Sequence, residues 1–292
     1  MKNKKIITVN SVSGGKTSAY IAANYPADYN IFALVTVEDK NCLFPDAKIR
    51  QIVSDKIGRD FIGTVEDDAI IYTMLDLEQF IGSKINWVVG KTFEQIINNK
   101  NGKTYIPNVM KRTCSDAMKV APIAKFWYDN IKQPCEMRIG FRANEMNRAK
   151  NMLNKTNEDG FTREKIMIEE NENKRNKWQD FYWRKPVFPL IDDNIYKDKI
   201  VNFWKDKPVR FAKFNNCIGC FHRNELFLKH QSINHPNKFN WFIEQEEKSI
   251  KDYRGRQWKK GSPTYKEIYN SLQQIQLFDD DFNECDSGYC GL

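Results

Sequence analysis

The fold of this 292-residue chain is decided by the stretch Ser11-Val-Ser13-Gly14-Gly15-Lys16-Thr17-Ser18, because it separates two segments of different periodicity. An apolar run, Ile6–Val9, precedes it, and a helical pattern, Thr17–Asn24, follows it. A second apolar run comes at Ile31–Val37, so the N-terminal residues predict a strand, a tight turn, a helix and a parallel strand. The turn would place unpaired backbone N–H groups at the start of a helix, where they attract an anion such as phosphate.

Helical and apolar segments continue to alternate along the chain. The pattern predicts helices over 46–57, 68–81, 92–98, 115–130 and 196–204, and a buried strand over Met137–Phe141. We therefore expect an α/β fold, with an open, mainly parallel sheet and flanking helices, over residues 1–200. Within it, the polar stretch 149–184 has little apolar periodicity and predicts a mobile loop or a lid. Residues 201–292 predict a basic, mainly helical portion that contains cysteines.

Composition limits the classes of protein. The chain has 46 Lys and Arg against 38 Asp and Glu, a net charge of +8, and 41% hydrophobic residues, which is enough for a core. No window approaches the roughly 18 consecutive apolar residues of a membrane span, and no secretory signal is recognisable. Seven cysteines without an export signal favour reduced thiols, so we expect a cytoplasmic protein without a membrane partner. Residues 205–260 carry 13 basic against 6 acidic residues, with Trp241, Tyr253 and Trp258 between them. Clustered Lys and Arg can follow phosphates while Trp and Tyr stack on bases, so this segment indicates binding of DNA or tRNA.

The glycine turn can be compared with two kinds of phosphate-binding loop. A Walker A loop needs a glycine at position 10, where the chain has Asn10. The PP-loop pattern Ser-Gly-Gly-x-x-Ser, in contrast, is satisfied by Ser13–Ser18. Further along, the chain contains Arg112-Thr-Cys114-Ser-Asp-Ala-Met-Lys119-Val-Ala-Pro122, then Gly140-Phe-Arg142-Ala-Asn-Glu145-Met-Asn-Arg148, and then Pro186-Val-Phe-Pro-Leu-Ile-Asp-Asp193.

In this order, the four stretches resemble the PP-loop superfamily, which includes the N-type ATP pyrophosphatases and the phosphoadenosine-phosphosulfate (PAPS) reductases. Ser115 stands where threonine is usual, Met146 replaces a serine, and the last stretch lacks its tryptophan. Gly63-Thr-Val-Glu66-Asp-Asp68 and Asp76-Leu-Glu-Gln79 are similar to phage-type members with an adenine nucleotide α-hydrolase-like fold.

The resemblance implies an enzyme that binds ATP with Mg²⁺ and cleaves it to AMP and pyrophosphate while it adenylates an acceptor, in sulfur-linked or nucleic-acid modification. Charge develops on the departing pyrophosphate, so backbone amides and cations must face it. Glu38 and Asp39 would hold the ribose or Mg²⁺, and Glu145 would pair with an arginine or accept a proton. The nominated nucleotide-binding residues are Ser11, Ser13, Gly14, Gly15, Lys16, Thr17, Ser18, Glu38, Asp39 and Gly140. The nominated catalytic residues are Lys119, Arg142, Glu145 and Arg148.

The cysteines leave several interpretations open. Cys217 and Cys220 form a C-x-x-C pair, and Cys285 with Cys290 supplies a second pair, so the four thiolates would hold Zn²⁺ or a [4Fe–4S] cluster. The family resemblance favours the iron–sulfur cluster. Alternatively the four thiols bind nothing, or Cys290 is the nucleophile of a reductase and Cys285 resolves it. Cys114 is a further candidate for a cluster ligand.

These readings give two alternatives to the adenylating enzyme. One is a thiol- or cluster-dependent PAPS or adenylyl-sulfate reductase. The other is a nucleic-acid-binding protein without catalysis, in which the cysteines hold a structural zinc. The partners expected from these hypotheses are an adenine nucleotide, a DNA or tRNA substrate and a sulfur donor protein.

Overall fold

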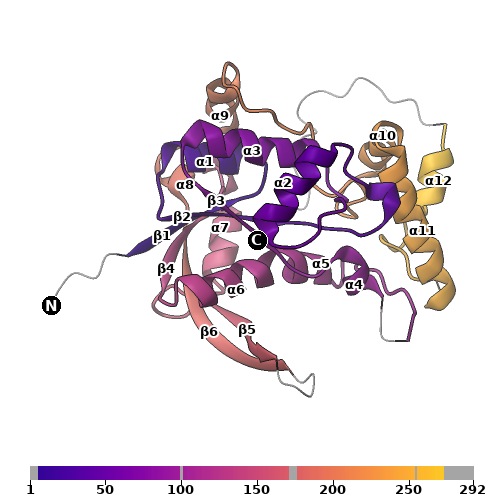
Figure 1. Cartoon of the computed structure of the whole chain (residues 1–292), viewed down its shortest axis with the longest axis horizontal. Coiled ribbons are helices and arrows are strands. Elements are labelled where there is room, and N and C mark those ends of the chain that lie inside the picture. Colours follow the sequence, from indigo (N-terminus) through magenta and orange to yellow (C-terminus); the bar gives the residue numbers. More distant parts are fainter. Residues whose placement is uncertain (1–5, 99–100, 171–175, 254, 273–292) are drawn as a thin grey trace.

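The computed structural model describes residues 6–98, 101–170, 176–253 and 255–272 (Figure 1). Its centre is a six-stranded sheet with the strand order β3-β2-β1-β4-β6-β5. All neighbouring strands are parallel except β5 and β6, which form an antiparallel pair at one edge. The predicted α/β fold with an open, mainly parallel sheet is therefore confirmed. The strands are β1 (Ile7–Val12), β2 (Tyr29–Leu34), β3 (Ile85–Val89), β4 (Cys135–Arg138), β5 (Thr162–Glu170) and β6 (Asn176–Val187).

The helices predicted over 17–24, 46–57, 68–81, 92–98 and 196–204 are present with ends that differ by at most one residue, whereas the predicted helix 115–130 is divided into three segments. Its middle segment is a short π-helix, η2, a wider turn that proteins often place near functional residues. The α-helices are α1 (Lys16–Asn24), α2 (Ala47–Ile57), α3 (Ala69–Ile81), α4 (Phe93–Ile97), α5 (Thr113–Ser115), α6 (Ala121–Asn130), α7 (Met146–Leu153), α8 (Pro189–Asp192), α9 (Lys197–Trp204), α10 (Glu225–Asn234), α11 (Pro236–Asp252) and α12 (Tyr265–Asn270). The other short segments are η1 (Lys40–Cys42), η2 (Asp116–Val120) and η3 (Ala143–Glu145).

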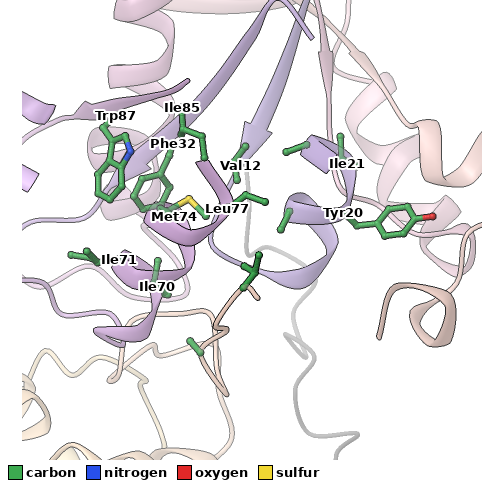
Figure 2. Packing of buried hydrophobic residues seen from close by; sticks show 14 of the residues in the cluster. Val12, Tyr20, Ile21, Phe32, Ile70, Ile71, Met74, Leu77, Ile85 and Trp87 are labelled. Atoms are coloured by element: carbon green, nitrogen blue, oxygen red, sulfur yellow. The ribbon is translucent and has the colours of Figure 1, made fainter. Parts of the chain in front are cut away.

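Helices cover both faces of the sheet. On one face, Val12, Phe32 and Trp87 of the strands pack against apolar residues of α1 and α3 such as Ile21 and Met74 (Figure 2). On the other face, a second cluster joins the strands to α6 and α7. Because side chains alternate between the faces of a strand, the nearly continuous apolar sequence of β2 fits a strand that is buried on both sides.

Asn10 shows why the Walker A pattern does not apply. The residue lies inside β1, fully buried, and its Nδ2 donates to Asn30 Oδ1 on β2 at 2.9 Å and to the Tyr25 carbonyl at 3.0 Å. Arg138 of β4 donates from Nη1 to Asn10 Oδ1 at 3.3 Å. The asparagine therefore links three neighbouring strands, and only Ser13, Gly14 and Gly15 separate β1 from α1.

The stretch 149–184 corrects the prediction of a long loop. It contains most of α7, β5 and much of β6, and the two strands form a hairpin that projects from the sheet (Figure 1). Ile166 and Trp183 are buried, whereas most residues of the hairpin are exposed or half-buried. An edge hairpin with so much solvated surface carries few apolar residues, so its period of two was too weak to recognise.

The C-terminal helices pack against the loops that follow the strands. A single buried cluster joins Val35 and Phe93 to Trp241, Phe242 and Trp258, so the described part of this portion shares its core with the α/β portion. The prediction that it is mainly helical is confirmed for residues 201–253 and 255–272 by α10, α11 and α12. Within the described ranges, no helix has both the length and the apolar character that crossing a membrane requires.

Candidate functional site

The serines of the glycine turn hold the turn in shape. Ser18 Oγ accepts a hydrogen bond from the backbone N–H of Ser13 at 3.0 Å and lies 3.1 Å from Ser13 Oγ. It also donates to the Gly15 carbonyl at 3.1 Å. Gly14 has a φ of +81°, which is in the left-handed region that favours glycine. The backbone of this turn thus explains the spacing of serines and glycines in Ser13–Ser18.

The N-terminus of α1 has no side-chain cap. Its N-cap residue is Gly15, and the first hydrogen bond inside the helix runs from Ala19 N–H to the Gly15 carbonyl at 3.0 Å. The N–H groups of residues 16–18 therefore have no acceptor within the helix. Together with the dipole of the helix they carry a partial positive charge, and they can bind an anionic oxygen.

A cavity of about 660 Å³ opens at this helix end. It lies where β1 and β4 end, and β1 pairs with β2 on its other side, so the chain changes direction across the sheet at this point. In open α/β sheets such a position is the usual place for a ligand. The cavity brings together the following nominated residues: Ser11, Ser13, Gly15, Lys16, Thr17, Ser18, Gly140, Arg142, Glu145 and Arg148.

Glu145 joins two arginines of this cavity. Its Oε2 accepts from Arg142 N–H at 2.8 Å and from Arg142 Nε at 3.0 Å, and its Oε1 accepts from Arg148 Nη1. Burial raises the pKa of Glu145, but the hydrogen bonds of Arg142 and the charges of both arginines more than offset this, so that its pKa lies below the usual value. The carboxylate is therefore ionised near neutral pH and positions the two cations. This arrangement favours the arginine-partner interpretation over the proton acceptor.

The aromatic ring of Phe141 supports the same cluster. The Arg148 guanidinium lies over this ring, with 4.3 Å between Cζ and the ring centroid. The ring itself stacks on Phe188, with centroids 5.4 Å apart and planes at 7°. Stacking on an aromatic face restricts a guanidinium to one plane, so Arg148 is held by its ring contact as well as by Glu145.

Sequence reasoning missed the opposite side of the cavity, which α9 and the segment after it provide. We call this side the C-terminal wall. Trp204 donates from Nε1 to the Lys16 carbonyl at 2.9 Å, and Asn215 touches the loop, since a Cβ on Gly15 would lie 3.0 Å from Asn215 Nδ2. The excess of Lys and Arg after residue 204 was the available signal. The residues of the C-terminal wall are Lys197, Ile200, Val201, Trp204, Lys205, Phe211, Ala212, Lys213, Asn215, Asn216 and Arg223.

The cavity is strongly basic. Among the described residues that line it, Glu145 is the only acidic side chain. The cationic ones are Lys16, Arg142, Arg148, Lys197, Lys205, Lys213 and Arg223. Apolar side chains, among them Ile139, Phe141 and Phe211, complete the lining. A ligand that carries several negative charges and one flat apolar group suits this combination.

Four of the residues nominated for nucleotide binding or catalysis lie outside the described lining. Lys119, in η2, pairs with Glu66, with Nζ 3.0 Å from Oε1. Gly14 is buried against α3. The backbone N–H groups of Glu38 and Asp39 donate to Glu94 Oε1 at 2.9 and 3.2 Å, and the Asp39 carboxylate accepts from Asn41 N–H at the start of η1. In these contacts Lys119 pairs with a buried carboxylate, Gly14 packs on α3 and Asp39 caps η1.

The described residues do not complete a metal site. Cys217 and Cys220 are half-buried in a turn in which Cys220 N–H donates to the Cys217 carbonyl at 3.1 Å. Within residues 6–98, 101–170, 176–253 and 255–272, no group of three His, Cys, Asp or Glu side chains is arranged to hold a metal ion. Cys285 and Cys290, the other two nominated ligands, lie outside the described residues.

Two of the aromatic residues expected to stack on bases are in the core. Trp241 and Trp258 have no exposed surface, and Trp258 Nε1 donates to the Phe242 carbonyl at 3.0 Å. The interpretation of both as stacking platforms is therefore wrong, because neither ring can reach a ligand. Tyr253 is half-buried and packs edge-on against Tyr105, with ring centroids 5.1 Å apart.

Comparisons with known proteins do not assign the chain to a family: no protein-family model matches it, and a search of curated proteins finds no significant match.

Proposed function

We propose that the chain binds ATP at the N-terminus of α1 and transfers its AMP moiety to an acceptor, with release of pyrophosphate. The observation that carries the proposal is the convergence of two separate motifs, 11–18 and 140–148, on one basic cavity at the carboxyl edge of the sheet. The sequence resemblance to PP-loop enzymes, which have an adenine nucleotide α-hydrolase-like fold, supports the same reaction. The cavity volume of about 660 Å³ is in the range that small-molecule sites occupy.

In the proposed reaction, a nucleophilic atom of the acceptor attacks the α-phosphorus of ATP. The bond from this phosphorus to the oxygen that bridges to the β-phosphate breaks, and pyrophosphate leaves with that oxygen and the electron pair. Negative charge then increases on the pyrophosphate. The amides at the start of α1 and the cations Lys16, Arg142 and Arg148 are the groups in this cavity that would stabilise it.

The donor set of the cavity indicates how Mg²⁺ would enter. Mg²⁺ prefers carboxylate and phosphate oxygens, and the one carboxylate in the described lining, Glu145, is already bound by two arginines. We therefore propose that Mg²⁺ is carried by the phosphates of the nucleotide. In the reductase alternative the nucleophile would be Cys290, which lies outside the described residues, so the described lining bears only on the binding of the nucleotide.

The test combines a binding assay with product analysis. ATP labelled at the α-phosphate and at the γ-phosphate is incubated with wild-type protein and with Arg142→Gln. We expect wild type to bind ATP and to release pyrophosphate when an acceptor is present, and the variant to bind at least about tenfold more weakly because a charge-assisted contact is lost. Arg163→Gln is the matched control, since Arg163 is 60% exposed on the β5–β6 hairpin. Release of orthophosphate, or equal ATP affinity of Arg142→Gln and wild type, would contradict the proposal.

A further inference from the structure

We propose that the base of the bound nucleotide stacks on Phe211, and that Asp76 positions this ring through an ion pair with Arg210. The inference rests on the proposed function, because it takes the phosphates of the nucleotide to lie at the N-terminus of α1. It adds a specificity-determining residue to that site, since a ring contact distinguishes a nucleotide from a chain of phosphates without a base. Phe211 belongs to the C-terminal wall, whereas Asp76 lies on α3, outside the described lining.

The aromatic side chains of the described lining are Phe141, Trp204 and Phe211. Phe141 and Trp204 are only 5% and 4% exposed, and Phe141 already has a guanidinium over its ring and a phenyl ring stacked on it. Phe211 is half-buried, so more of its side chain is accessible from the cavity. Every base has a flat π-face that can stack on such a ring. Phe211 is therefore the aromatic residue of the described lining that is best placed to meet a base.

The ring of Phe211 lies next to the phosphate-binding turn. Lys16 Nζ is 6.0 Å from the ring centroid, at the outer limit of a cation–π contact. Trp204 contacts both residues: its ring packs edge-on against Phe211, with centroids 5.0 Å apart, and its Nε1 donates to the Lys16 carbonyl. A nucleotide whose phosphates lie at Lys16 would therefore have its base close to this ring.

Asp76 fixes the backbone beside this ring. Its carboxylate accepts hydrogen bonds from the backbone N–H of Arg210 at 3.0 Å, from Nε at 2.7 Å and from Nη2 at 2.8 Å. The guanidinium also lies over the ring of Tyr72, one turn earlier on α3, with Cζ 4.4 Å from the centroid. The hydrogen bonds of Arg210 lower the pKa of Asp76, so its carboxylate is ionised near neutral pH. Because Arg210 and Phe211 are adjacent in the chain, this pair holds the backbone from which the Phe211 ring extends.

The segment that carries Phe211 depends on such an attachment. Residues 205–224, between α9 and α10, include no helix or strand, so no regular hydrogen-bond ladder sets their position. A ring that is already ordered before the base arrives loses less conformational entropy on binding. The ion pair on α3 therefore affects the base, although neither Asp76 nor Arg210 is in the described lining.

The experiment measures by calorimetry the binding of three probes: a nonhydrolysable ATP analogue, inorganic tripolyphosphate, which has no base, and adenosine, which has no phosphate. For Phe211→Leu we expect affinity for the analogue to fall about fivefold, the lower end of the range for base–aromatic stacking, and affinity for tripolyphosphate to stay unchanged. Phe211→Tyr keeps the ring and should bind the analogue as wild type does. Phe203→Leu is the matched control, because Phe203 is also half-buried and packs on Trp204, with centroids 4.8 Å apart, but is not in the described lining.

A second pair of variants tests the ion pair. For Asp76→Asn we expect affinity for the analogue to fall about threefold, because an exposed ion pair contributes less than a stacked ring, and affinity for tripolyphosphate to stay unchanged. Asp180→Asn is the control, since it breaks an Arg–Asp pair of the same kind, at 2.7 Å from Arg163, on the exposed β5–β6 hairpin.

The outcomes separate the base contact from the proposed function. Equal analogue affinity of Phe211→Leu and Phe203→Leu would overturn the stacking role, and so would an equal loss of analogue and tripolyphosphate affinity in Phe211→Leu. Equal effects of Asp76→Asn and Asp180→Asn would overturn the positioning role of Asp76. If wild type bound adenosine through Phe211 but did not bind tripolyphosphate, the proposed function would fail and the base contact would stand. If wild type bound tripolyphosphate as tightly as the analogue, the base contact would fail and the phosphate site at α1 would stand.

Discussion

Replacing Gly14 with alanine tests the packing of the phosphate-binding turn most directly. The structure gives two separate costs. Gly14 has a φ of +81°, and an L-residue in the left-handed region costs about 1–2 kcal/mol. The added Cβ would also lie 2.6 Å from Cγ2 of Ile70, on α3, and 3.4 Å from its Cβ and Cγ1. Ile70 is 1% exposed and cannot move into solvent, so overpacking adds about 1–3 kcal/mol. We expect Gly14→Ala to lower the free energy of unfolding by about 2–5 kcal/mol in total.

Gly58 provides a matched control for this variant. It follows α2 with a φ of +68°, and a Cβ at this position would meet no atom within 4 Å. Gly58→Ala therefore measures the left-handed cost alone, and the difference between the variants measures the contact with Ile70. Urea unfolding, monitored by tryptophan fluorescence, gives both values, provided that the slope of the transition is unchanged. If Gly14→Ala destabilised the protein no more than Gly58→Ala, the inference that the turn is packed tightly against α3 would be refuted.

Three further substitutions address the cavity and its surroundings. Glu145→Gln should weaken ATP binding, because both arginines lose the carboxylate that positions them. The pKa of Glu145 in the folded protein lies below 4.5, so the stability that its carboxylate provides is complete above pH 4.5 and is lost as pH falls through that folded pKa. Thermal unfolding across pH should therefore show that the variant loses less stability on acidification than wild type does. Trp204→Phe removes the hydrogen bond to the Lys16 carbonyl and should cost about 1 kcal/mol in unfolding and weaken nucleotide binding in calorimetry. Lys119→Met leaves Glu66, which is 3% exposed, without this cation and should lower the free energy of unfolding in urea by about 3 kcal/mol, while ATP affinity is unchanged.

Each of these substitutions has a control of the same chemical kind. Glu244→Gln changes an exposed glutamate of α11, Trp178→Phe changes a tryptophan that is 50% exposed on β6, and Lys125→Met breaks an exposed ion pair with Asp129. If Glu145→Gln lost as much stability on acidification as wild type, the ion pairs of Glu145 with Arg142 and Arg148 would be contradicted. Equal nucleotide affinity of Trp204→Phe and Trp178→Phe would remove Trp204 from the site. A selective loss of ATP binding in Lys119→Met would restore Lys119 as a contact of the nucleotide.

Local sequence was sufficient for the loop side of the cavity. The change from an apolar run to a helical pattern at Ser13–Ser18 predicted a strand, a turn and a helix, and the structure has all three. The carboxyl ends of parallel strands lie at the same edge of a sheet, so Arg142, which comes just beyond the predicted strand Met137–Phe141, is expected at the edge where ligands bind. Strand β3, in contrast, was not predicted. Its sequence, Ile-Asn-Trp-Val-Val, is short, and a short apolar run does not distinguish a strand from a helix.

The C-terminal wall could not be predicted in the same way. Asn215 meets Gly15, and Trp204 meets Lys16, across separations of about 200 and 188 residues. Such contacts depend on how α9 packs on α1, and no periodicity within either segment specifies this. The basic composition after residue 204 was recognised, but composition does not show which cations face a cavity. Nor does it show which aromatic residues are buried, and this is why Trp241 and Trp258 were misjudged.

The contacts of the turn explain why residues 13–18 and the C-terminal wall belong to one site. Gly14 packs on α3, Ser18 closes the turn from within α1, and the C-terminal wall approaches Gly15 and Lys16 from the other side. A helix N-terminus binds an anion well only when its N–H groups are held in place before the anion arrives. Here the residues that hold them come from three distant segments. The cations of the C-terminal wall come from one of these same segments, so the segment that fixes the turn also supplies the largest share of the positive charge. A change in the 204–223 segment should therefore alter the shape of the turn and the charge of the cavity together.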